Sequence, residues 1–369
     1  MKPDPGLSGW LQLSLSPGLT PSTLRRLLAD FGLPDNVLSR PRAELVRYAP
    51  ASAVDTLFSH ATAEAVAKAL DWARRPGHSI VTLADEAYPR PLLEVPDPPL
   101  LLYIAGRMEL LARPALAVVG SRNATPQGES NAEAFARSLS QAGLTIVSGL
   151  ALGIDAAAHR GGLGGPGSTV AVLGTGIDVL YPRRNAELAE QISQRGALVS
   201  EFALGTEPAA YHFPRRNRLI SGISRGCLVV EAAAASGSLI TAKLAAEQGR
   251  EVFAIPGSIH SPLSKGCHAL IKSGAKLVES AEDVLSELSG FASAAPVERR
   301  TAAQPIRAQG EDALLDHMGH DPVDIDLLCT RAGLSPEQVA SHLLRLELDG
   351  RITALPGGLY QRLEKGPAR

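Results

Sequence analysis

The side chains best suited to bind a charged ligand are concentrated in residues 213–224, which have the sequence FPRRNRLISGIS. Arg215, Arg216 and Arg218 lie beside Asn217, and the stretch separates two apolar segments that are typical of buried strands, ALVSEF and GCLVVEA. Guanidinium groups next to small-residue turns are suited to contact phosphates along a nucleic-acid backbone. By itself the stretch leaves a second interpretation equally open, a solvated and salt-bridged loop.

Glycine-rich turns follow several apolar runs between residues 113 and 280. These turns are Gly120-Ser121-Arg122, Ser148-Gly149, Gly174-Thr175-Gly176 and Ser236-Gly237-Ser238. Continuous Val, Ile and Leu runs predict strands buried on both faces, and therefore a parallel sheet with helices on both sides, a Rossmann-like α/β fold. Ligands of such sheets bind at the carboxyl ends of the strands. We expect each turn to precede a helix and to offer its N–H groups to an anion.

Aromatic side chains surround the arginine-rich stretch in the sequence. They are Tyr181, Phe202, Tyr211, His212 and Phe213. Aromatic rings beside cationic turns can stack on bases and hold a single strand without sequence preference. Most of the five are expected in the core, and Phe213 and Tyr181 are the better stacking candidates because Pro and paired arginines follow each of them.

Signatures of catalysis are weak. GTGIDV has only two of the three glycines of the dinucleotide fingerprint, although Glu201 ends the next strand as a ribose-binding acid would. Asp155 and His159 are four residues apart on an expected helix and could form a triad with Ser148, but we favour a role in bracing the turn. No P-loop or metal-binding signature is present, so we expect no catalytic residue, no cofactor and no metal.

Composition limits the kind of protein this can be. The chain has 369 residues and 45% hydrophobic residues, enough for two or three packed domains. The net charge of −2 requires that any nucleic-acid site be a local basic patch. Three separated cysteines argue against a disulfide framework and favour a cytoplasmic protein. We find no signal peptide in the first residues and expect no membrane span.

Four regions are expected along the chain. Residues 1–78 form a helical domain of the SAM-like or helix-hairpin-helix type, with Thr20 or Ser22 as a helix cap. Residues 79–285 form the extended Rossmann domain, which begins with a proline-rich arm at 79–112 carrying one edge strand, LLYIAG. Residues 286–308 form a linker. Residues 309–369 form a winged helix whose third helix is capped by Ser335 and begins at Pro336.

The charges are distributed unequally between these regions. Residues 113–280 contain 16 Lys and Arg against 12 Asp and Glu, whereas residues 311–364 contain 4 against 10. A winged helix that reads DNA should carry a basic third helix. We therefore expect the Rossmann domain to bind nucleic acid and the winged helix to contact protein or to regulate.

The assembled motifs resemble one family, the DNA processing protein A family (DprA, also called Smf), over the whole chain. The motifs are VGSRNATPQGE, IVSGLALGIDAAAHRGGL, GIDVLYPRRNAELAEQI, LVSEFALGTEP, HFPRRNRLISGIS, SGSLITAKLAAEQGREVFAIPGS and GCHALIKSGAKLV. The resemblance implies a non-enzymatic homodimer that binds single-stranded DNA, protects incoming DNA in natural transformation and loads RecA recombinase onto it. It also implies contact with, or displacement of, single-strand-binding protein.

The resemblance assigns roles to particular positions. It implies DNA binding by Gly120, Ser121, Arg122, Arg216, Asn217, Arg218, Ser236, Gly237, Ser238, Thr241, Lys265 and Gly266, to which we add Gly149, Arg183, Phe213 and Arg215. The segment with Leu270, Ile271 and Leu277 resembles the region used for dimerisation and RecA contact. This chain has His268 where the family usually has Asn, so no hydrogen bond is carried over to that side chain.

Two other functions remain to be weighed. A nucleotide-processing enzyme of the phosphoribohydrolase type would share the Rossmann variant, but its PGGxGTxxE loop is replaced here by EAAAASGSLITA. Glu231 precedes that turn, so the catalytic acid of the loop has no counterpart. A transcription regulator would bind duplex DNA through the winged helix, which the acidity of that region disfavours.

Overall fold

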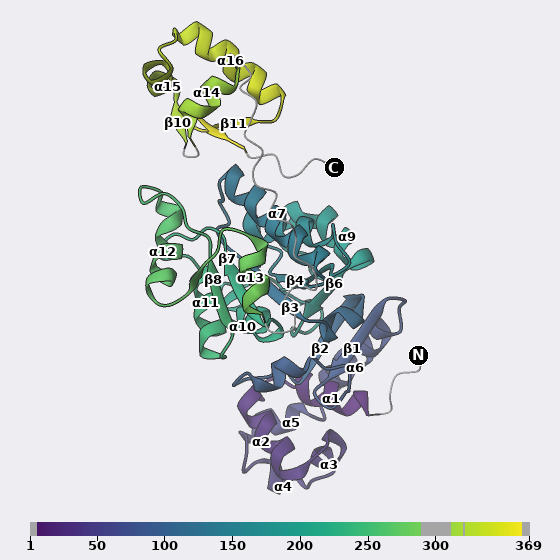
Figure 1. Cartoon of the computed structure of the whole chain (residues 1–369). Coiled ribbons are helices and arrows are strands. Elements are labelled where there is room, and N and C mark those ends of the chain that lie inside the picture. The colour runs from purple at the N-terminus through teal and green to yellow at the C-terminus, as the bar shows by residue number, and fades with distance from the viewer. Residues whose placement is uncertain (1–5, 289–310, 320–321, 364–369) are drawn as a thin grey trace.

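A computed structural model of the chain describes residues 6–288, 311–319 and 322–363. Figure 1 shows a helical N-terminal region, a nine-stranded sheet with helices on both faces, and a small C-terminal domain. Most of the expected linker, 286–308, lies outside the described residues, and helix α13 (Ala281–Glu287) extends into its first two positions.

The N-terminal region is helical, as expected. Its helices are α1 (Leu7–Leu15), α2 (Pro21–Phe31), α3 (Pro34–Leu38), α4 (Arg42–Leu45), α5 (Ala51–Thr56) and α6 (His60–Ala73). Thr20 is the residue that caps α2, because its hydroxyl accepts a hydrogen bond from Thr23 N and Pro21 occupies the first helical position. The apolar faces of these helices share one core with strand β2 (Leu101–Gly106), so the region packs directly against the sheet.

The central sheet has the strand order β1-β2-β6-β5-β4-β3-β7-β8-β9. The remaining strands are β1 (His78–Thr82), β3 (Ala115–Val119), β4 (Thr145–Ser148), β5 (Thr169–Val172), β6 (Ala197–Ser200), β7 (Gly226–Val229), β8 (Glu251–Ala254) and β9 (Lys276–Leu277). Strands β3 to β9 pair in parallel, which confirms the expected Rossmann-like sheet. The chain fills one side of β3 with β4, β5 and β6 and then crosses to the other side for β7. The topological switch therefore lies between β3 and β7, where the carboxyl ends of the strands leave a crevice.

Helices cover both faces of this sheet because its buried strands carry apolar residues that alternate between the faces. Along β3, Leu116 and Val118 pack against α7 (Pro126–Gln141), α8 (Ile154–Gly162) and α13. Ala117 and Val119 pack on the opposite side, against α10 (His212–Ile223), α11 (Ser238–Glu247) and α12 (Lys265–Lys272). Helix α9 (Ala186–Arg195) shares its core with β2 and the N-terminal helices.

The proline-rich arm differs from the expectation in two respects. It contributes two strands, β1 and β2, and the expected edge strand β2 is an inner strand that pairs with both β1 and β6. The prolines of this arm lie between the strands and in the short helix η1 (Arg90–Glu94), so they interrupt neither ladder. A second short helix, η2 (Met108–Ala112), leads from β2 to β3.

The C-terminal domain is a winged helix, as expected. It consists of α14 (Glu311–Met318), α15 (Ile325–Ala332), α16 (Pro336–Leu348) and a sheet of β10 (Val323–Asp324), β11 (Ile352–Leu355) and β12 (Leu359–Arg362). Ser335 caps α16 and forms a capping box with Gln338. The domain has a hydrophobic core of its own, centred on Leu328 and Leu343.

Two features are absent from the part of the chain that the structure describes. None of the helices in the described ranges is long and apolar enough to cross a membrane. The same ranges contain no group of three or more His, Cys, Asp or Glu side chains placed to hold a metal ion.

Candidate functional site

A cavity of about 600 Å³ lies at the topological switch of the sheet. Most of its lining comes from three stretches: the end of β3 with the turn after it (119–123), part of the face of α10, and the turn 233–238 with the first turn of α11. Ala151 and Asp155, from the turn after β4 and the start of α8, also line it. The structure thus brings together three of the regions that the sequence singled out. The turn at Gly174–Gly176 is not among the lining residues, and no helix begins directly after it. The expectation that each of the four turns precedes a helix is therefore wrong for that turn.

The turn after β3 is held tightly. A Cβ atom on Gly120 would lie 2.6 Å from Ile154 Cγ1 and 2.9 Å from the carbonyl oxygen of Glu231, so a side chain does not fit there. Thr125 caps α7 by accepting a hydrogen bond from Gly128 N at 3.0 Å. This turn places Ser121 and Arg122 at the cavity wall.

Glu231 is the side chain that anchors this turn from the neighbouring strand, and the sequence analysis gave it no such role. Its carboxylate accepts hydrogen bonds from Thr125 N at 2.9 Å and from the Thr125 hydroxyl at 2.6 Å. Burial raises the pKa of Glu231, and the two bonds from Thr125 oppose that rise. The position of Glu231, an acidic residue shortly after the buried strand β7 at the switch point, was the feature of the sequence that could have indicated this role.

The turn before α11 is open toward the cavity. The Ser236 and Ser238 hydroxyls lie 2.7 Å apart, and Gly237 has no atom within 4 Å of the position of a Cβ. Helix α11 has ten residues, and the positive end of its dipole lies at the cavity lining, where it favours an anion. Its first three N–H groups, those of Ser238, Leu239 and Ile240, donate to the Ser236 hydroxyl at 3.4 Å, the Ser236 carbonyl oxygen at 3.1 Å and the Gly237 carbonyl oxygen at 3.2 Å. Thr241, one turn further along α11, also lines the cavity.

Residues 213–223, which were interpreted as basic side chains beside small-residue turns or as a solvated loop, belong to helix α10. This is a correction: Arg215, Arg216 and Arg218 are helical, and Arg183 and Arg184 lie in the short helix η3 (Arg183–Asn185). Successive side chains of a helix point about 100° apart, so the three arginines of α10 face different surroundings. Phe213, Arg216 and Asn217 line the cavity, whereas Arg215 and Arg218 do not.

Arg216 forms the buried floor of the cavity and is only 4% exposed. Its Nη1 donates hydrogen bonds to the carbonyl oxygens of Gly149, at 2.6 Å, and Val172, and its Nε donates to Asn217 Oδ1 at 3.1 Å. Burial lowers the pKa of Arg216 to about 10, and nearby Asp155 opposes this. The guanidinium therefore remains charged at neutral pH.

Gly149 lies behind Arg216 and does not line the cavity. A Cβ atom at this position would come within 2.5 Å of Arg216 Cζ. The glycine thus makes room for the arginine, and its carbonyl oxygen fixes the guanidinium.

Asp155 and His159 brace the turn after β4, as the favoured interpretation held. Asp155 Oδ2 accepts hydrogen bonds from Gly149 N at 3.1 Å and Ala151 N at 3.4 Å. His159 Nε2 accepts from Leu150 N at 3.2 Å, and its Nδ1 lies 2.7 Å from the Thr169 hydroxyl. Thr169 already donates to a carbonyl oxygen, so the histidine carries its proton on Nδ1. Burial lowers the pKa of His159 to about 3, which keeps the ring neutral.

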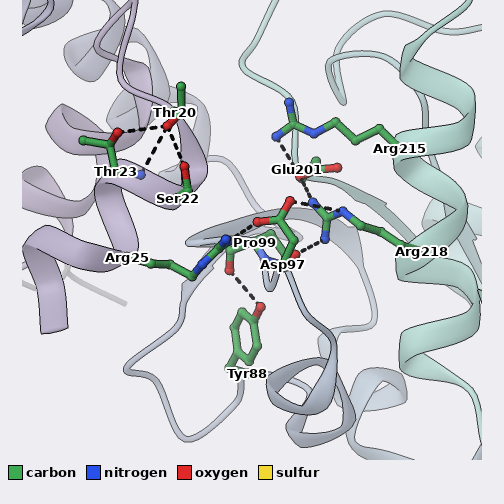
Figure 2. A network of polar contacts seen from close by, with 10 residues as sticks. All are labelled: Thr20, Ser22, Thr23, Arg25, Tyr88, Asp97, Pro99, Glu201, Arg215 and Arg218. Carbon is green, nitrogen blue, oxygen red and sulfur yellow. Dashed lines mark hydrogen bonds and ion pairs between the residues drawn. The ribbon is translucent and has the colours of Figure 1, made fainter. Parts of the chain in front are cut away.

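Arg218 and Arg215 face the other side of α10, toward the N-terminal helices (Figure 2). Glu201, 3% exposed, accepts from Arg218 and, at 3.2 Å, from Arg215. Arg218 also donates to the Asp97 carbonyl oxygen, and the Asp97 carboxylate pairs with Arg25 of α2. Glu201, which was weighed as a ribose-binding acid, thus pairs with two arginines. Arg218 belongs to an ion-pair network and does not line the cavity.

Arg122 is the exposed cation at the cavity. Its guanidinium lies over the Phe213 ring, 5.3 Å from the ring centroid. Within the described part of the chain it forms no ion pair. The five aromatic side chains form two groups: Tyr181 packs against Phe213, and Phe202 and Tyr211 both pack against His212.

The remaining predicted residues lie on and after α12, next to the cavity but outside its lining. Gly266 N donates to the Ala232 carbonyl oxygen at 2.8 Å, and Lys265 Nζ donates to the carbonyl oxygen of Ile259. His268 Nε2 lies 3.0 Å from the Gly257 carbonyl oxygen. Leu270 and Ile271 are half-buried, whereas Leu277 on the edge strand β9 is 49% exposed.

The helical region, the Rossmann-like sheet with a cavity at its switch point, and the winged helix together define a class of multidomain α/β proteins. Residues 79–289 match the family model of DNA recombination-mediator protein A, and residues 298–358 match that of the DprA winged helix domain. The chain belongs to the DprA/Smf family, as the resemblance implied.

Known relatives are similar over most of the chain. Protein Smf of Escherichia coli strain K12 is 44% identical over 307 residues, which are 82% of each chain. The X-ray structure of DNA processing protein A from Streptococcus pneumoniae superposes with a TM-score of 0.68 and 40% identity, covering 78% of this chain and 99% of that one. The Helicobacter pylori protein, whose structure describes a single-stranded DNA binding mode, has a TM-score of 0.51 and 29% identity, covering 56% and 93%.

Proposed function

We propose that the cavity binds single-stranded DNA without sequence preference, and that the chain is a binding protein and not an enzyme. The observation that carries this proposal is the convergence on one crevice of the Phe213 ring, the turns at 120–122 and 236–238, the positive end of the α11 dipole and Arg122, which forms no ion pair with the described residues. Phosphates would be held by the turns at 120–122 and 236–238, by Thr241 and by Arg122. A base would stack on Phe213. The single-stranded DNA binding mode of the related H. pylori protein supports this proposal.

The geometry refines the roles of the other predicted residues. Arg216 and Asn217 line the floor, where only Arg216 carries a charge, and Gly149 positions Arg216. Arg215 and Arg218 stabilise the junction with the N-terminal helices, so we no longer assign phosphates to them. Lys265 and Gly266 form hydrogen bonds that hold the segment beside the cavity. They would contact only nucleotides that lie outside the cavity.

The proposal is tested by fluorescence anisotropy with labelled oligo-dT and with the matching duplex at equal length. We expect tighter binding of the single strand, because unpaired bases can reach Phe213 whereas stacked ones cannot. A mixed-sequence single strand should bind about as tightly as oligo-dT. Binding of neither DNA form at low salt would refute the proposal, and a preference for duplex would move the DNA site to another domain.

We further propose that the chain protects incoming DNA in natural transformation and hands it to RecA, as a homodimer in the cytoplasm, and that it meets single-strand-binding protein there. Membership of the family supports this proposal. Leu270, Ile271 and the exposed Leu277 would supply the dimer and RecA contact.

Light scattering tests the dimer: Leu277→Glu should yield monomers, and Leu344→Glu on the winged helix, where Leu344 is also exposed, should not. An unchanged mass for Leu277→Glu would exclude this contact.

A further inference from the structure

Beside the cavity, Tyr181, Arg183 and Arg184 form a surface that we call the exit ridge. We propose that single-stranded DNA leaves the cavity across this ridge, so that nucleotides beyond those in the cavity stack on Tyr181 and pair their phosphates with the two arginines. This inference rests on the proposed function and adds the course of the strand outside the cavity.

The ridge continues an aromatic row that begins inside the cavity. The Arg122 guanidinium lies 5.3 Å from the ring centroid of Phe213, which lines the cavity. The ring centroids of Phe213 and Tyr181 lie 5.7 Å apart. Tyr181 is 44% exposed, so part of its ring is free to receive a base. A strand with one base on Phe213 therefore finds its next aromatic surface at Tyr181.

A second tie fixes the ridge to the cavity. Asn185, which ends η3, is 8% exposed, and its Nδ2 donates to the carbonyl oxygens of Leu150 at 2.9 Å and Ala151 at 3.1 Å. Ala151 lines the cavity. The ridge is thus held at both ends, by Tyr181 against Phe213 and by Asn185 against the cavity wall, and its arginines are presented from a fixed backbone.

The charges of the ridge are free to meet phosphates. Arg183 and Arg184 are exposed, and neither forms an ion pair within the residues that the structure describes. The acidic neighbours in the sequence do not neutralise them: Asp178 accepts a hydrogen bond from Gly205 N at 2.7 Å, and Glu187 lies in the first turn of α9. Arg215 and Arg218, by contrast, share Glu201.

The test compares a short and a long oligonucleotide, dT2 and dT20, by anisotropy on the full chain. We expect Arg183→Ala/Arg184→Ala to weaken dT20 binding about 10-fold and to lower its salt slope by about 1.4, since each lost phosphate contact on a single strand removes about 0.7. Tyr181→Ala should also weaken dT20 binding about 10-fold, because a stacked base is lost. Binding of dT2 at low salt should change less than about two-fold, because a cavity of about 600 Å³ has room for a dinucleotide without use of the ridge.

Matched variants separate the ridge from general charge and from misfolding. Arg74→Ala/Arg75→Ala removes two exposed charges at the end of α6 and should leave dT20 binding unchanged. Tyr181→Phe keeps the ring and should bind as the wild type does. On the unmodified protein, photocrosslinking of dT20 carrying 5-iodouracil should label Tyr181.

Two results would overturn the ridge. Equal losses for dT2 and dT20 would mean that the substitutions damage the cavity, and wild-type dT20 binding in both ridge variants would mean that the strand leaves elsewhere. Either result leaves the cavity proposal standing, because wild-type binding of oligo-dT is measured in the same series. Failure of the wild type to bind either oligonucleotide would remove both proposals.

Discussion

Gly149 shows how a single missing side chain supports the candidate site. The space that its Cβ would occupy is filled by the Arg216 guanidinium. We predict that Gly149→Ala lowers the free energy of unfolding by about 2 kcal/mol, because the overpacked arginine must shift off its two carbonyl partners. Urea denaturation measures this. Gly237→Ala, where a Cβ would meet nothing within 4 Å, is the control and should be within about 0.5 kcal/mol of the wild type. Equal losses in the two variants would contradict this explanation.

His159 should make the protein sensitive to acid. The folded state holds this ring neutral, with a pKa of about 3, whereas the unfolded chain binds a proton at its ordinary value of about 6.5. Between these values the unfolded state binds more protons, so stability falls as pH falls. The loss attributable to His159 approaches about 1.4 kcal/mol per pH unit below 6.5.

The comparison variant is His159→Gln, whose side chain does not titrate. We predict that wild type is more stable than His159→Gln at pH 7.5 and that this advantage shrinks as the pH is lowered to 5. Urea denaturation across this range provides the measurement. A pH-independent difference between the two proteins would show that the ring has the same pKa in the folded and unfolded states, and would contradict this account.

At the scale of elements, α10 connects the cavity to the N-terminal helices. One face of this helix carries Phe213 and Arg216, and the other carries Arg215 and Arg218, which pair with Glu201 (Figure 2). Removing one partner of a buried ion pair leaves the other charge without compensation. We predict that Arg218→Ala destabilises the protein by about 3 kcal/mol.

A double substitution separates the ion pair from simple loss of volume. Arg218→Met with Glu201→Gln should recover part of the stability lost in Arg218→Ala, because no buried charge is then left unpaired. Calorimetry on the wild type and these two variants measures this. If Arg218→Ala unfolded at the wild-type temperature and lost affinity for oligo-dT, Arg218 would belong to the DNA site after all.

The sequence allowed the sheet and its turns to be predicted, because continuous Val, Ile and Leu runs followed by glycine are local signals. It did not predict that residues 213–223 form a helix, although Phe213, Arg216 and Ile220 have helical spacing. The partner of Arg218 could not be predicted, because Arg218 lies on α10 whereas Glu201 follows β6, and the two side chains come together only when α10 packs beside the sheet. The inner position of β2 was missed for the same reason: its neighbours β1 and β6 are set by long-range pairing.

At the scale of the whole molecule, the DNA site should reside in the Rossmann-like domain and not in the winged helix. The acidic winged-helix region carries Glu337, Glu347 and Asp349 on or directly after α16, the helix that would enter a groove. We predict that a chain ending at residue 288 binds oligo-dT within about two-fold of the full chain. A fragment of residues 309–369 should bind neither DNA form. It should fold by itself, because it has its own core. DNA binding by that fragment would contradict this assignment.

The salt dependence of oligo-dT binding in three proteins decides whether the cavity is the phosphate site. We predict a steep negative slope of log affinity against log salt for the wild type, and the same slope for Arg74→Ala. Arg122→Ala should have a slope smaller by about 0.7, because one phosphate contact is lost, and an affinity about 10-fold lower at low salt. An Arg122→Ala variant with the wild-type slope and affinity would show that single-stranded DNA does not bind at this cavity.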